Sequence, residues 1–128
     1  MANTERANEI GLQFSKFYYE NFQNKSVIAT LYVDSSCLTF EGQTFVSREK
    51  IMQKLKELPF KTVTHVVSTC DSQYIFGADG EAVLVTVNGQ MKTDDDAPHG
   101  FNQTFVLSAV GSSYAISNEI FRLSLHQA

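Results

Sequence analysis

Residues 101–125 read FNQTFVLSAVGSSYAISNEIFRLSL, and this stretch decides the fold class. Apolar and polar side chains alternate over its first ten residues, so that Phe101, Gln103 and Phe105 share one face. A period of two is typical of a β-strand with one buried face. The Gly-Ser-Ser sequence that follows predicts a turn, and the remaining residues alternate in the same way. The sequence therefore predicts two consecutive antiparallel strands at this end of the chain.

Strand character extends toward the N-terminus from this pair. Two further long strands are predicted over 62–74 and 81–92, with a turn signal at 77–80 between them. A short hairpin is predicted over 37–46, because a Gly-containing loop separates two runs of alternating residues.

The N-terminal part of the chain is helical in character. Residues 4–24 carry apolar side chains at three- and four-residue spacing, which predicts one long amphipathic helix. A second short helix is predicted over 27–32, with Ser26 as its cap, and a third begins after Ser47 and ends at Pro59. Helices followed by a strand meander predict an α+β fold.

The 128 residues fit a single domain, 1–128, with one core. Three helices can cover only one face of a long twisted sheet, so that Val66 and Cys70 are expected on an uncovered face. A second copy of the chain is the simplest cover, and a homodimer is predicted.

Composition limits the classes of partner. The formal net charge is −4, whereas nucleic acids and anionic membranes need concentrated Lys and Arg, so neither is expected as a partner. The N-terminus lacks the apolar core of a signal peptide, and no apolar run approaches the ~20 residues that span a bilayer. Cys37 and Cys70 have no metal-ligand spacing and are interpreted as free thiols, so a cytosolic or nucleocytoplasmic protein is expected.

Acidic residues gather at two loops. Asp94, Asp95 and Asp96 stand together, and Glu41 stands in the early hairpin. The DDD sequence is a poor match to a calcium loop, because the alternating acids, the Gly and the closing Glu of such loops are absent. The acids remain either a solvated loop or a dock for a basic protein partner.

Apolar residues gather at the ends of the predicted elements. They are either core residues or, jointly, the lining of a pocket that accepts an aromatic side chain flanked by a cation. The residues are Phe40, Leu58, Pro59, Phe60, Val63, Met91 and Phe121.

Catalytic motifs are not found in the sequence. It contains no GxSxG, P-loop, GxGxxG or HExxH pattern. His65 lies inside a strand pattern and is interpreted as a hydrogen-bonded structural residue rather than a general base. An enzyme of this fold would need a carboxylate or His deep in its cavity with Tyr donors opposite, and Tyr18, Tyr32 and His65 are the available candidates.

Several segments, spread in order over almost the whole chain, resemble the nuclear transport factor 2 family. They are FYY at 17–19, YVDSSCLTFEGQ at 32–43, KL at 54–55, LPF at 58–60, GQMK at 89–92 and NEIFRL at 118–123. The resemblance implies an NTF2-like cone: a strongly curved antiparallel sheet wrapped around a long N-terminal helix, with two shorter helices. It also implies dimerisation through the sheet, with Ile120 at an apolar interface position.

The family resemblance implies a carrier that is not an enzyme and needs no cofactor, metal or small-molecule substrate. Family members carry GDP-bound Ran into the nucleus and pass the pore, between cytoplasm and nucleus, by contacts with FxFG nucleoporin repeats. A Ran aromatic enters an apolar mouth while rim acids pair with Ran cations. Carried over to this chain, the Ran-binding residues are Phe40, Glu41, Leu58, Val63, His65, Met91, Asp94, Asp96 and Phe121.

One position departs from the family pattern, and two alternative functions stay open. The family's repeat site uses a large aromatic in the first helical turn, where this chain has Ala7; the nearby candidates are Ile10 and Phe14. The alternatives are a cone-fold isomerase or dehydratase, and an NTF2-like adaptor that binds repeats without Ran. The enzyme would carry a buried ionisable group in its cavity, whereas the carrier is expected to have rim acids and an apolar interior.

Overall fold

The computed structural model of the chain describes residues 4–76 and 81–124, and within these it contains three helices and six strands. In chain order the elements are α1 (Thr4–Glu20), α2 (Lys25–Ala29), β1 (Tyr32–Phe40), β2 (Gln43–Val46), α3 (Arg48–Lys56), β3 (Val63–Tyr74), β4 (Ala82–Thr93), β5 (His99–Val110) and β6 (Ser113–Ser124). All the predicted elements are present, so the α+β class is confirmed. The turn predicted at 77–80 lies outside the described residues.

Local signals account for both ends of α3 but not for the start of α2. The Ser47 side chain accepts a hydrogen bond from the backbone N–H of Lys50, as expected for an N-cap, and α3 ends before Pro59. The cap predicted for α2 is wrong: Asn24 occupies that position, with no side-chain cap bond. No helix among the described residues is both long and apolar enough to cross a membrane.

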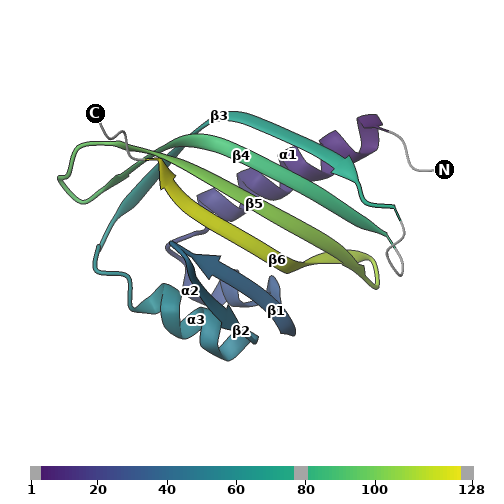
Figure 1. Cartoon of the computed structure of the whole chain (residues 1–128), viewed down its shortest axis with the longest axis horizontal. Helices are drawn as coiled ribbons and strands as arrows, with labels where there is room; N and C mark the ends of the chain where they lie inside the picture. Colours follow the sequence, from purple (N-terminus) through teal and green to yellow (C-terminus); the bar gives the residue numbers. More distant parts are fainter. Residues whose placement is uncertain (1–3, 77–80, 125–128) are drawn as a thin grey trace.

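The six strands form one mixed sheet in the order β2-β1-β6-β5-β4-β3 (Figure 1). All neighbouring pairs are antiparallel except β1 and β6, which run parallel, so the fully antiparallel sheet that was predicted is wrong in this one pairing. Alternation identifies strands without saying which of them pair. The parallel pairing nevertheless brings Phe40 at the end of β1 beside Phe121 in β6.

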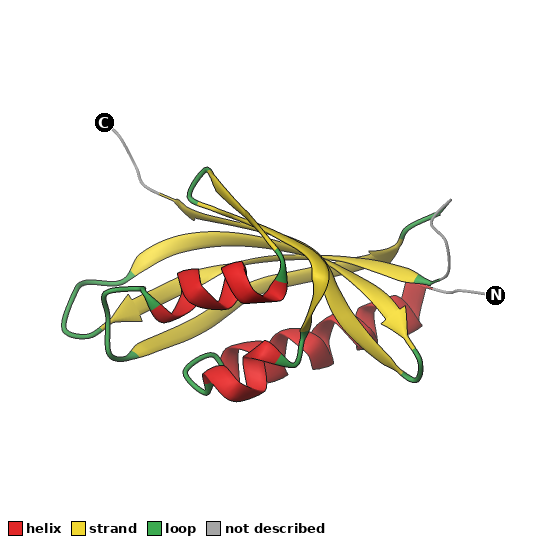
Figure 2. Ribbon diagram, turned by 90° about the horizontal axis from the view of Figure 1, so that it is seen from below, coloured by secondary structure: helices red, strands yellow, loops and turns green. Residues whose placement is uncertain are grey.

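Helix α1 lies along one face of the twisted sheet (Figure 2). The approach is closest at Gly11, where a Cβ atom would lie 1.8 Å from Oγ of Ser72 in β3. The core fills the space between helices and sheet. Its largest fully buried side chains are Tyr18, Tyr32, Phe101, Phe105, Ile28, Leu38, Ile51, Leu107, Ile116, Val83, Val85 and Val87.

The opposite face of β3–β6 carries no helix within the described part of the chain (Figure 1). Val66 and Ile120 are exposed there by 62% and 52%. Cys70 was predicted on this face and instead faces α1, with its Sγ 3.8 Å from the carbonyl oxygen of Gly11. A bulge between Val67 and Thr69 shifts the alternation of β3 by one residue, which turns Cys70 inward.

Candidate partner-binding pocket

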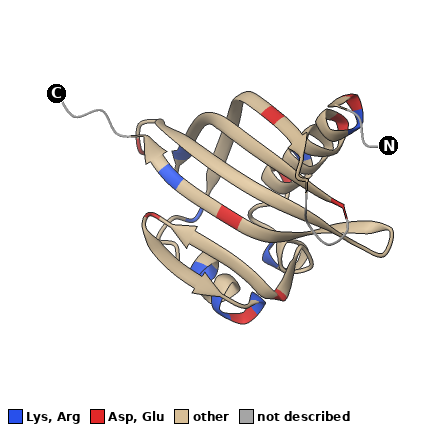
Figure 3. Cartoon of the chain, turned by 45° about the vertical axis from the view of Figure 1, so that its right-hand side comes forward, with Lys and Arg blue, Asp and Glu red and all other residues tan. Residues whose placement is uncertain are grey.

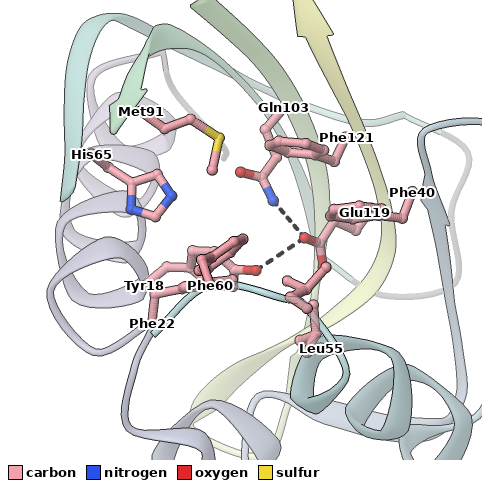
Figure 4. Close-up of a pocket in the computed structure, with 11 residues that line it drawn as sticks. Tyr18, Phe22, Phe40, Leu55, Phe60, His65, Met91, Gln103, Glu119 and Phe121 are labelled. Atoms are coloured by element: carbon pink, nitrogen blue, oxygen red, sulfur yellow. Dashed lines mark hydrogen bonds between the residues drawn. The ribbon is translucent and has the colours of Figure 1, made fainter. Parts of the chain in front are cut away.

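A pocket lies between α1, α3 and the ends of β1 and β3–β6 (Figure 4). Its free interior is about 20 Å³, which is room for about one water molecule. Most of its lining is aromatic or aliphatic. The lining residues are Tyr18, Phe22, Phe40, Leu55, Leu58, Phe60, His65, Met91, Gln103, Glu119 and Phe121.

Stacked rings form one wall of this pocket. Phe40 and Phe121 stack with ring centroids 4.8 Å apart and planes 10° from parallel, and Phe101 lies 6.0 Å from Phe121 on the other side. The stack follows from strand register, because Phe40 pairs with Phe121 and Leu123, two residues further along β6, pairs with Phe101. A flat, preformed aromatic wall suits an inserted aromatic side chain.

A buried carboxylate lies at the inner end of the pocket. The Glu119 side chain accepts hydrogen bonds from the hydroxyls of Tyr18 (3.1 Å) and Tyr32 (2.5 Å) and from the amide of Gln103 (2.5 Å). Burial outweighs these bonds and raises the pKa of the Glu119 carboxyl to about 7. The apolar interior expected of a carrier is therefore wrong at this point.

Sequence reasoning did not single out Glu119 or Gln103 as pocket residues. The alternation of the two strands could have identified them. Glu119 precedes the inward-facing Phe121 by two residues, and Gln103 lies between Phe101 and Phe105 on the buried face, so both side chains point inward. A polar residue at an inward position of a strand needs a partner. Here Gln103 and Glu119 bond to each other, Glu119 also accepts from Tyr18 and Tyr32, and Gln103 accepts from Tyr19.

His65 lies on the wall opposite Glu119 (Figure 4). Its ring centroid is 4.6 Å from that of Tyr19 and 5.3 Å from that of Phe22. Its Nδ1 is buried and has no hydrogen-bond partner among the described residues, so the predicted hydrogen-bonded role is wrong for this atom. Burial, with a smaller contribution from the charge of Lys25, lowers the pKa of His65 to about 4, and the ring is neutral at physiological pH.

Glu41 immediately follows Phe40, which lines the pocket. Glu41 and Gly42 form the two-residue turn between β1 and β2, and both have positive φ, 50° at Glu41 and 86° at Gly42. Its carboxylate accepts a hydrogen bond from the backbone N–H of Leu123 and so ties this hairpin to β6. The side chain is half-buried rather than the free tip that the hairpin pattern suggested.

Asp94 and Asp96 lie in the turn between β4 and β5. Oδ1 of Asp94 accepts from the backbone N–H groups of Lys61 (3.0 Å) and Thr62 (2.9 Å), and these bonds lower the pKa of its carboxyl. Asp94 therefore fixes the loop that carries Leu58 and Phe60. Asp96 is exposed, and its carboxylate makes no hydrogen bond within the described chain.

Five of the predicted partner-binding residues line one pocket: Phe40, Leu58, His65, Met91 and Phe121. Val63 does not line it and is instead buried in the core at the start of β3. No group of three or more His, Cys, Asp or Glu side chains able to hold a metal ion occurs in 4–76 and 81–124.

The repeat-binding residues predicted on α1 divide into two groups. Ala7 is fully buried, so it offers no surface to a repeat, and a bulky substitution there would disturb the core. Ile10 and Phe14 line a shallow groove with Phe17, which is 44% exposed, and Tyr114 of β6.

The fold and the pocket define a class of cone-shaped α+β domains. Among solved structures, the chain is similar to nuclear transport factor 2 from Cryptosporidium parvum, with a TM-score of 0.85 and 30% identity over 97% of this chain and 99% of that one. A putative dehydratase from Streptomyces avermitilis shares the fold at 10% identity, with a TM-score of 0.78 over 93% of this chain and 96% of that one.

The family model of the nuclear transport factor 2 (NTF2) domain matches residues 10–123. Relatives named Nuclear transport factor 2 occur in Candida glabrata, 40% identical over 91% of this chain and 94% of theirs, and in Emericella nidulans, 41% identical over 89% and 92%. The chain belongs to the nuclear transport factor 2 family.

Proposed function

We propose that this protein is a nuclear transport carrier that binds GDP-bound Ran through the pocket described above. The observation that carries the proposal is the convergence of Phe40, Leu58, His65, Met91 and Phe121 on one pocket. A Ran aromatic side chain enters along the stacked wall, where its apolar surface leaves water.

The acids at the mouth give the pocket its preference for a basic segment. Glu41 follows the lining residue Phe40, and Asp94 and Asp96 follow the lining residue Met91 in the same part of the chain, so we expect their negative charge close to the pocket. Charges at the rim act mainly on the rate of association and on the choice of partner. Because Glu41 and Asp94 also bind backbone N–H groups, their carboxylates are held in fixed positions and lose little conformational freedom when a cation pairs with them.

The carrier works as a homodimer that passes between cytoplasm and nucleus. The uncovered face of β3–β6, with Val66 and Ile120 exposed, supplies a self-complementary interface. FxFG repeats dock in the α1 groove, on Ile10, Phe14 and Phe17. In this chain Phe17 supplies the ring that a repeat contacts, in place of the aromatic that the family carries at the position of Ala7.

A catalytic function is the second candidate, because Glu119 is a buried carboxyl with a raised pKa inside a cavity. Its hydrogen bonds favour a structural role: two tyrosines and Gln103 already donate to its oxygens. His65, at a pKa of about 4, is a weak base at neutral pH. The relatives at 36–41% identity carry the name of a transport factor, and we propose that this chain has no enzymatic activity.

The proposal is tested by capturing the protein on immobilised Ran loaded with GDP or with GTP. We expect retention on the GDP form alone, and Phe40→Ala should weaken it by removing one ring of the stacked wall. Equal retention on both forms, or none on either, would contradict the proposal.

A further inference from the structure

A second hollow adjoins the aromatic pocket and has a different chemical character. It encloses about 360 Å³ including its opening. Three of its lining side chains, Leu55, Leu58 and Phe60, also line the aromatic pocket, so they form the wall between the two. The remaining lining residues are mainly cationic: Lys25, Lys56 and Lys61.

The three lysines come from three separate segments. Lys25 begins α2, Lys56 ends α3, and Lys61 lies in the loop before β3. Gln23 holds two of these segments together, those of Lys25 and Lys61: its amide donates to the carbonyl of Lys61 (2.9 Å), and its Oε1 accepts from the N–H of Val63 (3.4 Å). The lysines therefore face the same hollow from positions that the fold fixes.

The lysines of this hollow make no ion pair within the described residues, although the charge of Lys61 acts on the Asp94 carboxylate. Within the described residues the only ion pair is Arg6–Glu9, so Lys25, Lys56 and Lys61 have no carboxylate within 4.0 Å. Lys and Arg are also visible on α3 beside the hairpin (Figure 3).

Lys25 is the most enclosed of the three lysines. Its Nζ donates to the carbonyl of Phe22 (2.5 Å) and lies 3.8 Å from the centre of the Phe22 ring. Burial lowers the pKa of this ammonium. A cation destabilised by desolvation gains more from a nearby anion than a fully solvated one does.

We propose that this hollow binds an acidic side chain of the same protein partner whose aromatic residue enters the neighbouring pocket. The inference rests on the proposed function and adds to it a second charge contact of opposite sign. Alternate side chains of an extended segment lie about 7 Å apart on one face, a spacing that one wall of side chains can separate. The occupant is therefore a carboxylate about two residues from the aromatic.

The two charge contacts together select the direction of the bound segment. Acids Glu41 and Asp96 attract cations at the mouth of the pocket, while the lysine hollow attracts the carboxylate across the wall of Leu58 and Phe60. A segment bound in reverse would meet like charges at both places, which is unfavourable.

The test titrates GDP-loaded Ran into the wild type, the triple variant Lys25→Gln/Lys56→Gln/Lys61→Gln and the matched triple Lys→Arg variant. We expect the Gln variant to bind roughly tenfold more weakly and with a shallower salt dependence, while the Arg variant binds as the wild type does. The double variant Lys16→Gln/Lys50→Gln changes two exposed lysines elsewhere and should leave the affinity unchanged.

Each outcome separates the inference from the function on which it rests. If the wild type binds and the Gln variant binds equally well or more tightly, the lysine hollow has no acidic occupant and the inference is wrong, while the carrier function stands. If the wild type does not bind GDP-loaded Ran, both fall. Should the triple Gln variant unfold, Lys56→Gln and Lys61→Gln, whose side chains are exposed, are titrated singly and must each weaken binding.

Discussion

Glu41 and Asp94 each bind backbone N–H groups with the same carboxylate that we propose meets a cation of the partner. Both acids occupy turns with positive φ, 50° at Glu41 and 48° at Asp94, which residues other than Gly rarely adopt. The sequence identified both residues as candidates from their charge and their place in loops. It did not reveal the hydrogen bonds, because the acceptor–donor pairs are 82 residues apart for Glu41 and 32–33 for Asp94.

Replacing Glu41 in two ways separates charge from structure. Glu41→Gln keeps an oxygen that can accept from Leu123 and removes the charge, so stability should hardly change while Ran affinity falls roughly tenfold. Glu41→Ala also removes the acceptor and should lower the free energy of unfolding by about 1–2 kcal/mol. Calorimetric titration and thermal denaturation measure the two effects. An affinity of Glu41→Gln equal to that of the wild type would remove this charge from the site.

The raised pKa of Glu119 makes stability depend on pH. Its carboxyl binds a proton more tightly in the folded state, at a pKa of about 7, than at its ordinary value of 4.5. Stability should therefore fall as pH rises from about 4.5 to about 7, by on the order of 3 kcal/mol from this group. His65, whose pKa is lowered to about 4, acts in the opposite direction between about 4 and 6.5.

The Glu119 contribution is isolated by comparing wild type with Glu119→Gln. The variant loses overall stability, since its amide replaces an acceptor that receives three hydrogen bonds. Urea unfolding at several pH values should show the wild type losing its advantage over the variant as pH rises toward about 7. If the free energies of unfolding of wild type and variant changed with pH in the same way, the Glu119 carboxyl would have its ordinary pKa in the folded protein.

At the scale of elements, periodicity predicted the type and order of the helices and strands, with most ends within a few residues. The start of β1 was wrong: the strand begins at Tyr32, which was assigned to the second helix, rather than at Cys37. Periodicity predicted the faces less well, because the bulge at Val67–Thr69 is invisible in a pattern of β-branched and polar residues. Periodicity also could not predict which strands pair, because the parallel pairing of β1 with β6 depends on the arrangement of the whole sheet. That pairing creates the Phe40–Phe121 stack. The positions of the apolar residues at element ends allowed a shared pocket but left a core role open, and only the family resemblance favoured the pocket.

The packing of α1 on β3 is tested at Gly11. A methyl group there would meet both Oγ and Cβ of Ser72, at 1.8 and 2.8 Å, so the helix or the strand must move. Gly11→Ala should therefore lower the free energy of unfolding by about 1–3 kcal/mol, although Ala has a higher helix propensity than Gly. The double variant Gly11→Ala/Ser72→Gly should recover most of the loss. An unchanged or raised midpoint in denaturant for Gly11→Ala would contradict this close approach.

At the scale of the whole molecule, α1 covers one face of the long strands, and we propose that a partner copy covers the other. Ile120 is 52% exposed on that face in the single chain, next to the inward-facing Glu119 and Phe121. Dimerisation would thus act on the strand that also forms the pocket. The alternation of β6 made this division predictable from sequence.

Ile120→Glu tests the dimer. An unpaired charge in the interface is costly, whereas in the single chain the side chain lies in water, so the variant should be a folded monomer. Sedimentation velocity at micromolar concentration should show a wild-type dimer and a monomeric variant. The dimer proposal would be abandoned if the wild type itself sedimented as a monomer.

We propose that a Ran side chain occupies the aromatic pocket. The methyl NMR signals of the methionines report on this occupancy. Met91 lines the pocket, whereas Met52 packs between α2 and α3 and serves as an internal control. On addition of GDP-loaded Ran to protein carrying ¹³C-labelled methionine methyl groups, we expect a large shift of the Met91 signal, from the ring current of the inserted aromatic, and little shift of Met52. GTP-loaded Ran should shift neither. Binding of GDP-loaded Ran that leaves the Met91 signal in place would show that the pocket is not the site.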